Sequence, residues 1–281
     1  MRFGLIGHPI EHSLSPTLFK AGYNGMYPYD LIIIEDFEEA YRRFLDEYDG
    51  INVTAPFKEL ALRKADIVSE ECRLVGAANI LIKTPQGITA YNSDFRGVVA
   101  IFRGLKGDEK RTPFATSSLL PPAARGVARF FHPLSDHEKT VLIVGAGGAG
   151  KAAKAASEAL GYETTVINRT QYNPGIKPLS AFREEFSKAD IVIYNLPVRI
   201  PEIDMLTETD LCPGKEKVIL EANYRNPSFD NELIQRMVDV NPLISYIDGR
   251  EWLLQQAVTG YELFTGETPD YEAMKEVIKS K

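Results

Sequence analysis

The sequence predicts an α/β protein with mostly parallel strands, divided into two domains. Short apolar runs alternate with helix-like segments over most of the chain, which is the pattern of strands joined by helical crossovers. The length of 281 residues also predicts two domains, at roughly 150 residues a domain. In the second half, a glycine-rich turn follows a strand-like run and precedes a helix-like segment, as in a βα unit.

Composition and charge exclude several classes of protein. Apolar residues make up 44% and charged residues 25%, the balance of an ordinary globular protein. The 32 basic residues are outnumbered by 39 acidic ones, so a nucleic-acid partner is not expected. The longest uncharged stretch, Thr112–Ala124, is broken by three prolines and does not fit a membrane span. The first residues, MRFGLIGHPIEHS, lack the long apolar run of a signal peptide.

The cysteine count argues in the same direction. Cys72 and Cys212 are the only cysteines, too few for a disulfide framework or a zinc site. We therefore expect a soluble, cytoplasmic protein without a metal.

The first third of the chain shows strand and helix patterns in turn. Arg2–Ile6 and Leu31–Ile34 are short apolar runs that predict strands. Asp36–Tyr48 has apolar residues at three- and four-residue steps, which predicts an amphipathic helix. A short strand is predicted over Gly50–Thr54 and a helix over Phe57–Ile67.

A proline-rich stretch at about 106–139 separates this part from a more regular one. We expect a long surface loop there, with a lid or an oligomer contact as the alternative, since long loops in compact domains are often functional. The elements predicted around it are a helix over Phe95–Leu105, strands over Thr140–Val144, Glu163–Ile167, Ile191–Tyr194 and Val218–Glu221, and helices over Lys151–Leu160 and Arg250–Phe264.

The glycine-rich turn Gly145-Ala146-Gly147-Gly148-Ala149-Gly150 satisfies the pattern G-x-G-x-x-G. Residues without side chains let the backbone approach a pyrophosphate, whose charge is stabilised at the N-terminus of the following helix. The turn therefore predicts a dinucleotide site in a Rossmann-type domain. The alternative is a tight turn with a purely structural role.

The same glycines also satisfy half of a P-loop, G-x-x-x-x-G-K. The position after Lys151 is Ala152, which has no hydroxyl to ligate magnesium. Nucleotide hydrolysis and kinase chemistry are therefore disfavoured.

The end of the second strand of this domain indicates which dinucleotide is bound. A site for NAD usually has Asp or Glu there to hold the ribose 2′-hydroxyl, but this chain has Asn168-Arg169-Thr170. A guanidinium pairs bidentately with phosphate oxygens, so NADP is favoured over NAD. The alternative for Arg169 is a solvated surface charge.

Four polar segments lie at predicted strand ends and turns outside the glycine-rich region. Each has an ordinary explanation: Ser15 could cap a helix that begins at Pro16, Lys58 could be a surface lysine, and Asp94 could cap the helix that follows it. The segments are His12-Ser13-Leu14-Ser15-Pro16, Asn52-Val53-Thr54-Ala55-Pro56-Phe57-Lys58, Gly76-Ala77-Ala78-Asn79 and Asn92-Ser93-Asp94.

In their order and spacing, these segments resemble the shikimate dehydrogenase family, which includes shikimate/quinate dehydrogenases. Gly7–Pro16 matches the opening motif of the family, Asn52–Lys58 matches N-V-T-x-P-x-K, and Gly76–Asn79 matches G-A-x-N. Asn92-Ser93-Asp94 matches N-T-D, and Gly249 and Gln256 fall where the family has a cofactor glycine and a substrate glutamine. The resemblance covers nearly the whole chain.

The resemblance implies a fold and an activity. It implies a discontinuous substrate-binding catalytic domain, residues 1–100 and 250–281, and an NADP-binding Rossmann domain, residues 101–249. Family members reversibly reduce 3-dehydroshikimate to shikimate with NADPH, in the pathway to aromatic amino acids.

The resemblance also implies roles for individual residues. Lys58 and Asp94 would be the catalytic pair, with Lys58 as proton donor, and both would also contact the substrate. The remaining substrate-binding residues would be Ser13, Ser15 and Tyr224 for the carboxylate, and Thr54, Asn79 and Gln256, with Asp94, for the ring hydroxyls. The cofactor-binding residues would be Gly145, Ala146, Gly147, Gly148, Ala149, Asn168, Arg169, Thr170 and Gly249.

Several positions depart from the family pattern. Phe19-Lys20 stands where the family usually has His-Asn, and Ile80 replaces a threonine. Asn195-Leu196-Pro197-Val198 lacks the N-A-T-P-x-G loop, and Glu221 stands in a segment that usually contains Asp.

Two alternatives to an NADP-dependent shikimate dehydrogenase stay open. One is an enzyme for quinate or another ring acid, with NAD as cofactor. The other is a non-catalytic metabolite sensor, which the presence of Lys58 and Asp94 disfavours, because a sensor needs no proton donor. The protein is expected to be a monomer or a homodimer.

Overall fold

The computed structural model describes residues 1–105, 139–171 and 174–280. These residues fall into two compact units, one of residues 1–105 with 254–280 and one of residues 139–253. Most of the predicted loop at about 106–139 lies outside the described residues. The domain limits 1–100 with 250–281 and 101–249 therefore stay a prediction.

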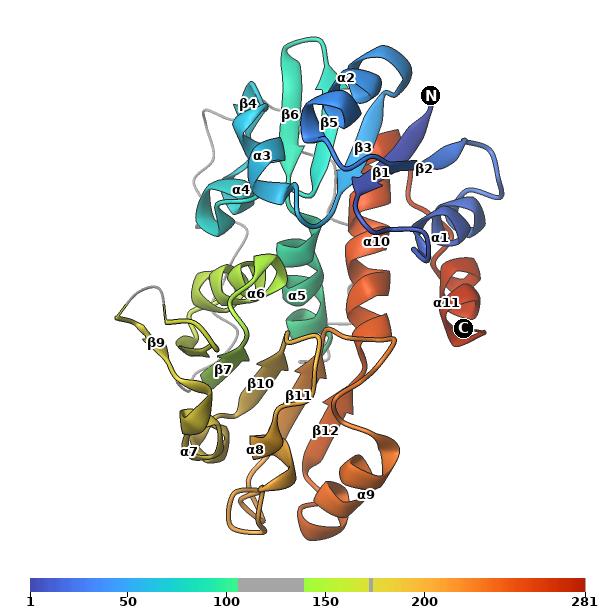
Figure 1. Cartoon of the computed structure of the whole chain (residues 1–281). Coiled ribbons are helices and arrows are strands. Elements are labelled where there is room, and N and C mark those ends of the chain that lie inside the picture. Colours follow the sequence, from blue (N-terminus) through green and yellow to red (C-terminus); the bar gives the residue numbers. More distant parts are fainter. Residues whose placement is uncertain (106–138, 172–173, 281) are drawn as a thin grey trace. The chain divides into compact units, whose positions relative to one another are not determined.

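The first unit contains a mixed sheet with the strand order β2-β1-β3-β5-β6-β4. Strand β1 lies parallel to β2 and β3, whereas β5 is antiparallel to both β3 and β6, and β4 is parallel to β6 (Figure 1). The strands are β1 Phe3–Gly7, β2 Tyr29–Ile33, β3 Gly50–Val53, β4 Ile67–Val68, β5 Ile80–Thr84 and β6 Gly87–Tyr91.

The helices of the first unit include two from the C-terminal end of the chain. Helix α11 packs against α1, so the last residues complete a unit that begins with the first ones. The helices are α1 Ser15–Gly22, α2 Phe37–Glu47, α3 Lys58–Arg63, α4 Glu70–Val75, α5 Ser93–Gly104, α10 Gly249–Thr265, which begins in the second unit, and α11 Tyr271–Lys279.

The second unit contains a parallel sheet with the strand order β12-β11-β10-β7-β8-β9. Counted from β7, this is the order 6-5-4-1-2-3 of a doubly wound dinucleotide-binding fold. The strands are β7 Thr140–Val144, β8 Glu163–Ile167, β9 Ile176–Lys177, β10 Ile191–Tyr194, β11 Lys217–Glu221 and β12 Ile244–Ile247. The helices are α6 Gly148–Ala159, the 3₁₀ helix Leu179–Ala181, α7 Phe182–Lys188, α8 Pro201–Asp204 and α9 Asn231–Val240.

The structure confirms the predicted α/β class, and strands β7, β8 and β10 have the predicted bounds. The helix predicted over Phe57–Ile67 is too long. It ends at Arg63, because the chain turns at Asp66, whose carboxylate accepts a hydrogen bond from Ile88 N at 2.8 Å, and Ile67 then pairs with β6 as β4. Helix α6 begins at Gly148, three residues before the predicted start.

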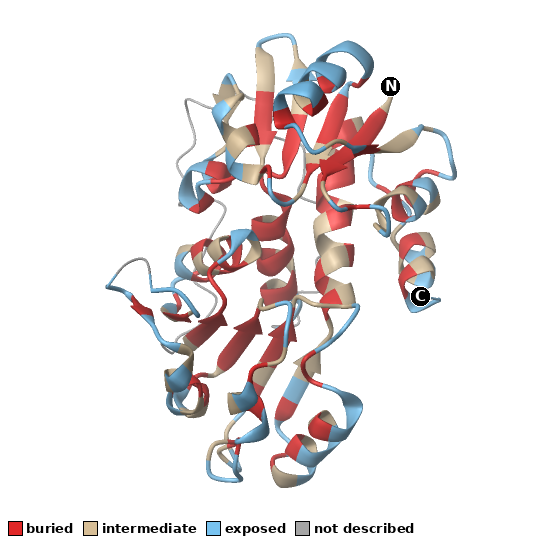
Figure 2. Cartoon of the chain, viewed as in Figure 1, coloured by how far each residue is buried: buried red, intermediate tan, exposed pale blue. Residues whose placement is uncertain are grey.

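Burial is greatest in the inner strands: β1 in the first unit and β10 in the second are buried along their whole length (Figure 2). Among the described residues, no helix is long and apolar enough to cross a membrane. In the same part of the chain, no group of three or more His, Cys, Asp or Glu side chains could hold a metal ion. Cys72 and Cys212 are both free thiols.

Lys217, the first residue of β11, is unusual among the buried residues of the second unit, because it is a lysine whose side chain is completely buried. Its ammonium donates hydrogen bonds to the carbonyl oxygens of Phe186, at 2.6 Å, and Ala189, at the end of α7. Burial lowers the pKa of Lys217 to about 8 from its ordinary value of 10.5. The fold therefore tolerates a buried cation by giving it carbonyl partners at a helix C-terminus.

Lys217 is expected to make stability depend on pH in an alkaline window. Between about pH 8 and 10.5 the unfolded chain binds more protons at this lysine than the folded chain does, so the free energy of unfolding should rise with pH. The variant Lys217→Met lacks this contribution. Urea unfolding at pH 7.5, 8.5 and 9.5 measures the free energy of unfolding of both proteins. The value for the parent minus the value for the variant should increase with pH, and a constant difference would contradict the assignment.

Candidate active site

Lys58 and Asp94 form an ion pair in the first unit, with 2.5 Å between Nζ and Oδ2. Lys58 is the first residue of α3, and Asp94 lies in the first turn of α5. Their side chains are 18% and 8% exposed. The interpretation of Lys58 as a surface lysine is therefore wrong, and the pair combines a proton-carrying group with a partner that orients it.

The turn Gly76–Asn79 contacts the main chain beside both partners. Ala78 N donates to the carbonyl oxygen of Lys58 at 3.0 Å. The side-chain oxygen of Asn79 accepts a hydrogen bond from Ser93 N at 2.7 Å, next to Asp94. The turn can be this tight because Gly76 ends α4 with a φ of +73°, a left-handed conformation that suits glycine.

Asn92, not Asp94, caps helix α5. Its side-chain oxygen accepts a hydrogen bond from Phe95 N at 3.0 Å, and its amide nitrogen donates to the carbonyl oxygen of Ala77 at 2.9 Å. The interpretation of Asp94 as a helix cap is therefore wrong. Because Asn92 satisfies the helix terminus, the Asp94 carboxylate can pair with Lys58.

Ser13 and Ser15 lie together at the start of α1. The Ser13 hydroxyl oxygen lies 3.2 Å from Ser15 N, from which it accepts, and 3.1 Å from the Ser15 hydroxyl. The residue that precedes the helix is Leu14, and no side chain caps it, so Ser15 is not the helix cap that local sequence suggested. Tyr261, on α10, donates to the carbonyl oxygen of Ser15 at 3.0 Å and fixes the backbone there.

Two polar side chains that sequence reasoning missed lie among these residues. The hydroxyl of Tyr29 donates to Asn52 Oδ1 at 2.7 Å and also interacts with Ser15. Burial raises the pKa of Tyr29. Asn52 belongs to the motif that ends at Lys58, which was a usable signal. Tyr29 precedes the apolar run Leu31–Ile34 that predicted a strand, and β2 begins at Tyr29 instead, so no sequence pattern pointed to it.

Thr54 and Gln256 complete the first-unit set, and within residues 1–105, 139–171 and 174–280 neither side chain forms a hydrogen bond. Thr54 follows β3, and its backbone nitrogen donates to the Ile6 carbonyl oxygen at 2.9 Å. A Cβ on Gly7 would lie 2.3 Å from the Thr54 methyl group, so glycine lets β1 pass close to Thr54. Gln256 lies on α10 and is half-buried.

The glycine-rich turn joins β7 to α6 in the second unit. Gly145 has a φ of +96°, and a Cβ on Gly150 would lie 1.9 Å from the Gly145 carbonyl oxygen. Gly147 is exposed, and a Cβ there would meet nothing within 4 Å. Two glycines thus allow close packing, while the third leaves open backbone at the N-terminus of a 12-residue helix. This arrangement fits a pyrophosphate group.

The loop after β8 is tied to this turn by Asn168. Its side-chain oxygen accepts from Ala146 N at 3.3 Å, and its amide nitrogen donates to Thr170 O at 2.9 Å. Arg169, between these two residues, is exposed, and the structure records no ion pair for it within the part of the chain that it describes.

The ends of β11 and β12 bring Tyr224 and Gly249 to the same edge of the sheet as the turn. A Cβ on Gly249 would lie 2.6 Å from the Ala222 carbonyl oxygen, so α10 starts directly against this loop. Glu221 is completely buried, and it accepts from Ser228 N at 2.5 Å and from the Tyr246 hydroxyl at 2.8 Å. Burial raises the pKa of Glu221. This carboxylate holds the loop that carries Tyr224.

Comparison with known proteins identifies the family. Residues 5–81 match the shikimate dehydrogenase substrate binding domain, and residues 249–279 match the shikimate 5'-dehydrogenase C-terminal domain. The chain is 30% identical to a shikimate dehydrogenase (NADP(+)) of Caldanaerobacter subterraneus subsp. tengcongensis, over 99% of this chain and 96% of that protein. The chain belongs to the shikimate dehydrogenase family.

Solved shikimate dehydrogenases share the fold. The Mycobacterium tuberculosis enzyme is 25% identical with a TM-score of 0.71, covering 99% of this chain and 98% of that one. A Thermus thermophilus enzyme, solved in complex with NADP(H) and shikimate, is 24% identical with a TM-score of 0.72, covering 100% and 99%. The predicted family is thereby confirmed, while the roles assigned to single residues stay predictions.

The structure brings the shikimate dehydrogenase motifs together within each unit. In the first unit, Lys58, Asn79 and Asp94 belong to one network of contacts, and Ser13 lies beside Ser15. Thr54 follows the strand β3 that carries Asn52, and Gln256 lies on α10. In the second unit, the predicted cofactor-binding residues and Tyr224 all come after the carboxyl ends of parallel strands. The turn residues Gly145, Ala146, Gly147, Gly148 and Ala149 follow β7. The clamp Asn168, Arg169 and Thr170 follows β8, Tyr224 follows β11, and Gly249 follows β12.

The glycines of the turn are expected to respond differently to an added methyl group. Gly150→Ala places a Cβ 1.9 Å from a backbone oxygen, and overpacking of this kind costs about 1–3 kcal/mol of stability. Gly147→Ala is the matched control: its φ of −72° suits alanine and its Cβ meets nothing within 4 Å, so stability should change by under about 1 kcal/mol. Chemical unfolding of both variants tests this, and equal losses would contradict it.

Proposed function

We propose that this protein is an NADP-dependent shikimate dehydrogenase that reversibly reduces 3-dehydroshikimate to shikimate in aromatic amino-acid biosynthesis. The observation that carries the proposal is the buried Lys58–Asp94 pair, with 2.5 Å between Nζ and Oδ2, in a unit that matches the substrate binding domain. The glycine-rich turn on a parallel sheet and the NADP(+)-dependent relatives support it. A quinate-specific enzyme and a non-catalytic sensor are not favoured.

Reduction of a ketone needs a hydride and a proton. Bound NADPH supplies the hydride. Lys58 Nζ donates the proton to the developing alkoxide oxygen, and takes it back in the reverse direction. Asp94 accepts a hydrogen bond from Nζ, so it limits the directions in which the ammonium can point. Their low exposure limits competition from bulk water at this step.

The other first-unit residues suit a cyclic acid with several hydroxyl groups. The paired hydroxyls of Ser13 and Ser15 bind the substrate carboxylate. Thr54, Asn79 and Gln256 supply hydroxyl and amide groups for the ring hydroxyls. An amide nitrogen carries two protons, so Asn79 can donate to a ring hydroxyl while it also donates to Ser93 Oγ at 3.1 Å.

The second-unit residues suit a dinucleotide with a 2′-phosphate. Gly145, Ala146, Gly147, Gly148 and Ala149 present backbone to the pyrophosphate at the start of α6. Arg169, with Asn168 and Thr170, binds the 2′-phosphate, and Gly249, at the start of α10, is a further cofactor-binding residue. We propose a monomer or homodimer that acts in the cytoplasm on small molecules, without a nucleic-acid or membrane partner.

The direct test is formation of the reduced dinucleotide, followed by absorbance, from shikimate or quinate with NADP or NAD. The parent protein should turn over shikimate with NADP at the highest kcat/KM of the four combinations. Lys58→Ala should lose at least a hundredfold in kcat with a smaller change in KM, because it lacks the proton donor of the transition state. Lys64→Ala, which removes a lysine paired with Glu38 at 2.8 Å near the other end of α3, should keep parental kcat.

Each outcome has a distinct meaning. Preference for quinate or NAD would replace the substrate or cofactor in the proposal, and no turnover in any combination would remove it. A kcat for Lys58→Ala within threefold of the parent would assign the proton transfer to another group.

Arg169 is expected to decide between the two dinucleotides. A charge-assisted bond to phosphate contributes roughly 1.5–3 kcal/mol, so Arg169→Ala should weaken NADP binding at least tenfold and leave NAD binding nearly unchanged. Titration of both dinucleotides into parent and variant, followed by calorimetry, measures this. Equal losses would show that Arg169 supports the loop or the adenine instead.

A further inference from the structure

Asn92 differs from the other side chains that cap helices in the described residues. Helices α2, α9 and α11 are capped by Asp36, Asp230 and Asp270, which are exposed carboxylates that accept from a backbone nitrogen. Asn92 is 1% exposed and uses both ends of its amide. It accepts from Phe95 N at 3.0 Å and donates to Ala77 O at 2.9 Å. Capping alone does not require the donor.

The hydrogen bond from the Asn92 amide nitrogen to Ala77 O links the start of α5, which carries Asp94, to a turn that contacts Lys58. Ala77 precedes Ala78, whose nitrogen donates to the Lys58 carbonyl oxygen at 3.0 Å. Asn92 itself lies two residues before Asp94. A short path of buried contacts therefore runs from the backbone of Lys58, through Ala78 and Ala77, to the start of α5. This path connects the two residues of the ion pair, which are 36 positions apart in sequence.

We propose that Asn92 is a positioning residue for the reaction, acting through the Lys58–Asp94 pair by tying the first turn of α5 to the turn before β5. The inference rests on the proposed function for its kinetic consequence. A buried amide is suited to this role, because it can satisfy a helix nitrogen and a carbonyl oxygen at once without placing a second charge beside Asp94.

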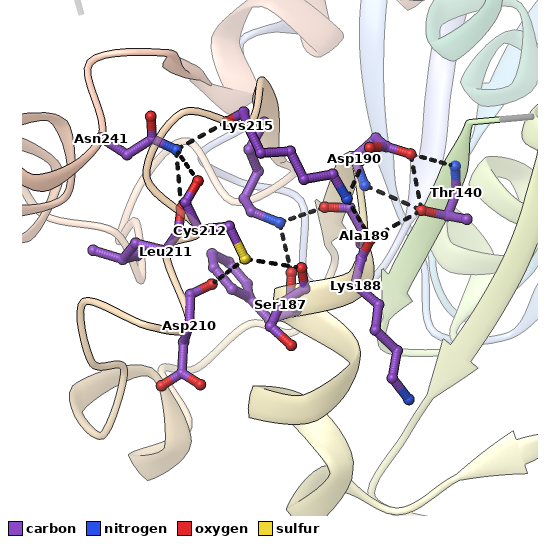
Figure 3. Close-up of polar contacts among 12 residues, drawn as sticks. Thr140, Ser187, Lys188, Ala189, Asp190, Asp210, Leu211, Cys212, Lys215 and Asn241 are labelled. Carbon is purple, nitrogen blue, oxygen red and sulfur yellow. Dashed lines mark hydrogen bonds and ion pairs between the residues drawn. The ribbon is translucent and has the colours of Figure 1, made fainter. Parts of the chain in front are cut away.

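The competing explanation is that Asn92 only stabilises the fold, and the chain offers a matched control for it. Asn241, on the second unit, is also completely buried and also bridges backbone groups (Figure 3). Its amide nitrogen donates to Leu211 O at 2.9 Å and Lys215 O at 2.9 Å, and its oxygen accepts from Leu243 N at 3.2 Å. It lies at the opposite end of its sheet from the glycine-rich turn.

The experiment compares Asn92→Ser, Asn92→Asp and Asn241→Ser with the parent. Serine and aspartate both cap helices but neither can donate to Ala77 O in the same way. We expect both Asn92 variants to lose at least tenfold in kcat at a temperature where they stay folded, with KM for NADPH within twofold. Asn241→Ser should lose thermal stability and keep kcat within twofold. In an Asp94→Asn background, Asn92→Ser should cause less than a twofold further loss.

A second readout does not depend on turnover. Trace acetylation followed by mass spectrometry measures how readily each lysine reacts, and Lys58 should react at least fivefold faster in both Asn92 variants, because its ion pair is loosened. Lys64 should react at the parental rate in every variant, and Lys58 should do so in Asn241→Ser.

The inference would be overturned if Lys58 were acetylated at the parental rate in both Asn92 variants. A kcat above half of the parental value in Asn92→Ser would also overturn it. The inference would also fail if the losses in kcat caused by Asn92→Ser and Asp94→Asn were fully additive, because Asn92 would then act independently of Asp94. If the parent protein fails to oxidise shikimate, the proposed function fails, and the acetylation rates still decide whether Asn92 holds the pair.

Discussion

The turn Gly76–Asn79 is the constraint on which the proposed chemistry depends. It forms hydrogen bonds to the segments of both partners. Ala78 N donates to the carbonyl oxygen of Lys58, and the Asn79 side-chain oxygen accepts from Ser93 N, next to Asp94. A lysine and an aspartate that come from separate helices are thereby held at ion-pair distance. Burial of such a pair is unfavourable unless its geometry is fixed and its surroundings are satisfied, so the turn and the pair must be considered as one structure.

Sequence patterns were sufficient where local forces decide the outcome. Strands such as β7 and β10 were predicted with correct bounds, because a short, nearly continuous apolar run between polar or glycine residues has few alternatives in an α/β protein. The choice between Asn92 and Asp94 as the cap of α5 could not be made locally, since both residue types cap helices equally well. It depends on Lys58, which is distant in sequence. Tyr29 was missed for the same reason: its partner Asn52 lies on another strand.

The second unit shows how one motif divides its tasks. Within the glycine-rich turn, Gly150 permits a helix to pack on a strand, whereas Gly147 leaves backbone accessible, as their positions in the motif predict. The segment with Glu221 departs from the family pattern, but its carboxylate still finds two backbone nitrogens and a tyrosine hydroxyl. A longer acid is therefore compatible with an ordered loop at the edge where the cofactor is proposed to bind.

The contacts of Asn79 have a consequence for how this site can change. Its side chain is proposed to recognise a ring hydroxyl, yet its oxygen already fixes the backbone next to Asp94 at 2.7 Å. Recognition of the ring and alignment of the reactive groups thus share one amide. A mutational route to a different ring acid that passes through this position would lose turnover before it gained a new preference. Thr54 and Gln256, the other two side chains proposed to bind the ring hydroxyls, have no such side-chain link within the part of the chain described, so under the proposed function a substitution there leaves the alignment of Lys58 and Asp94 unchanged.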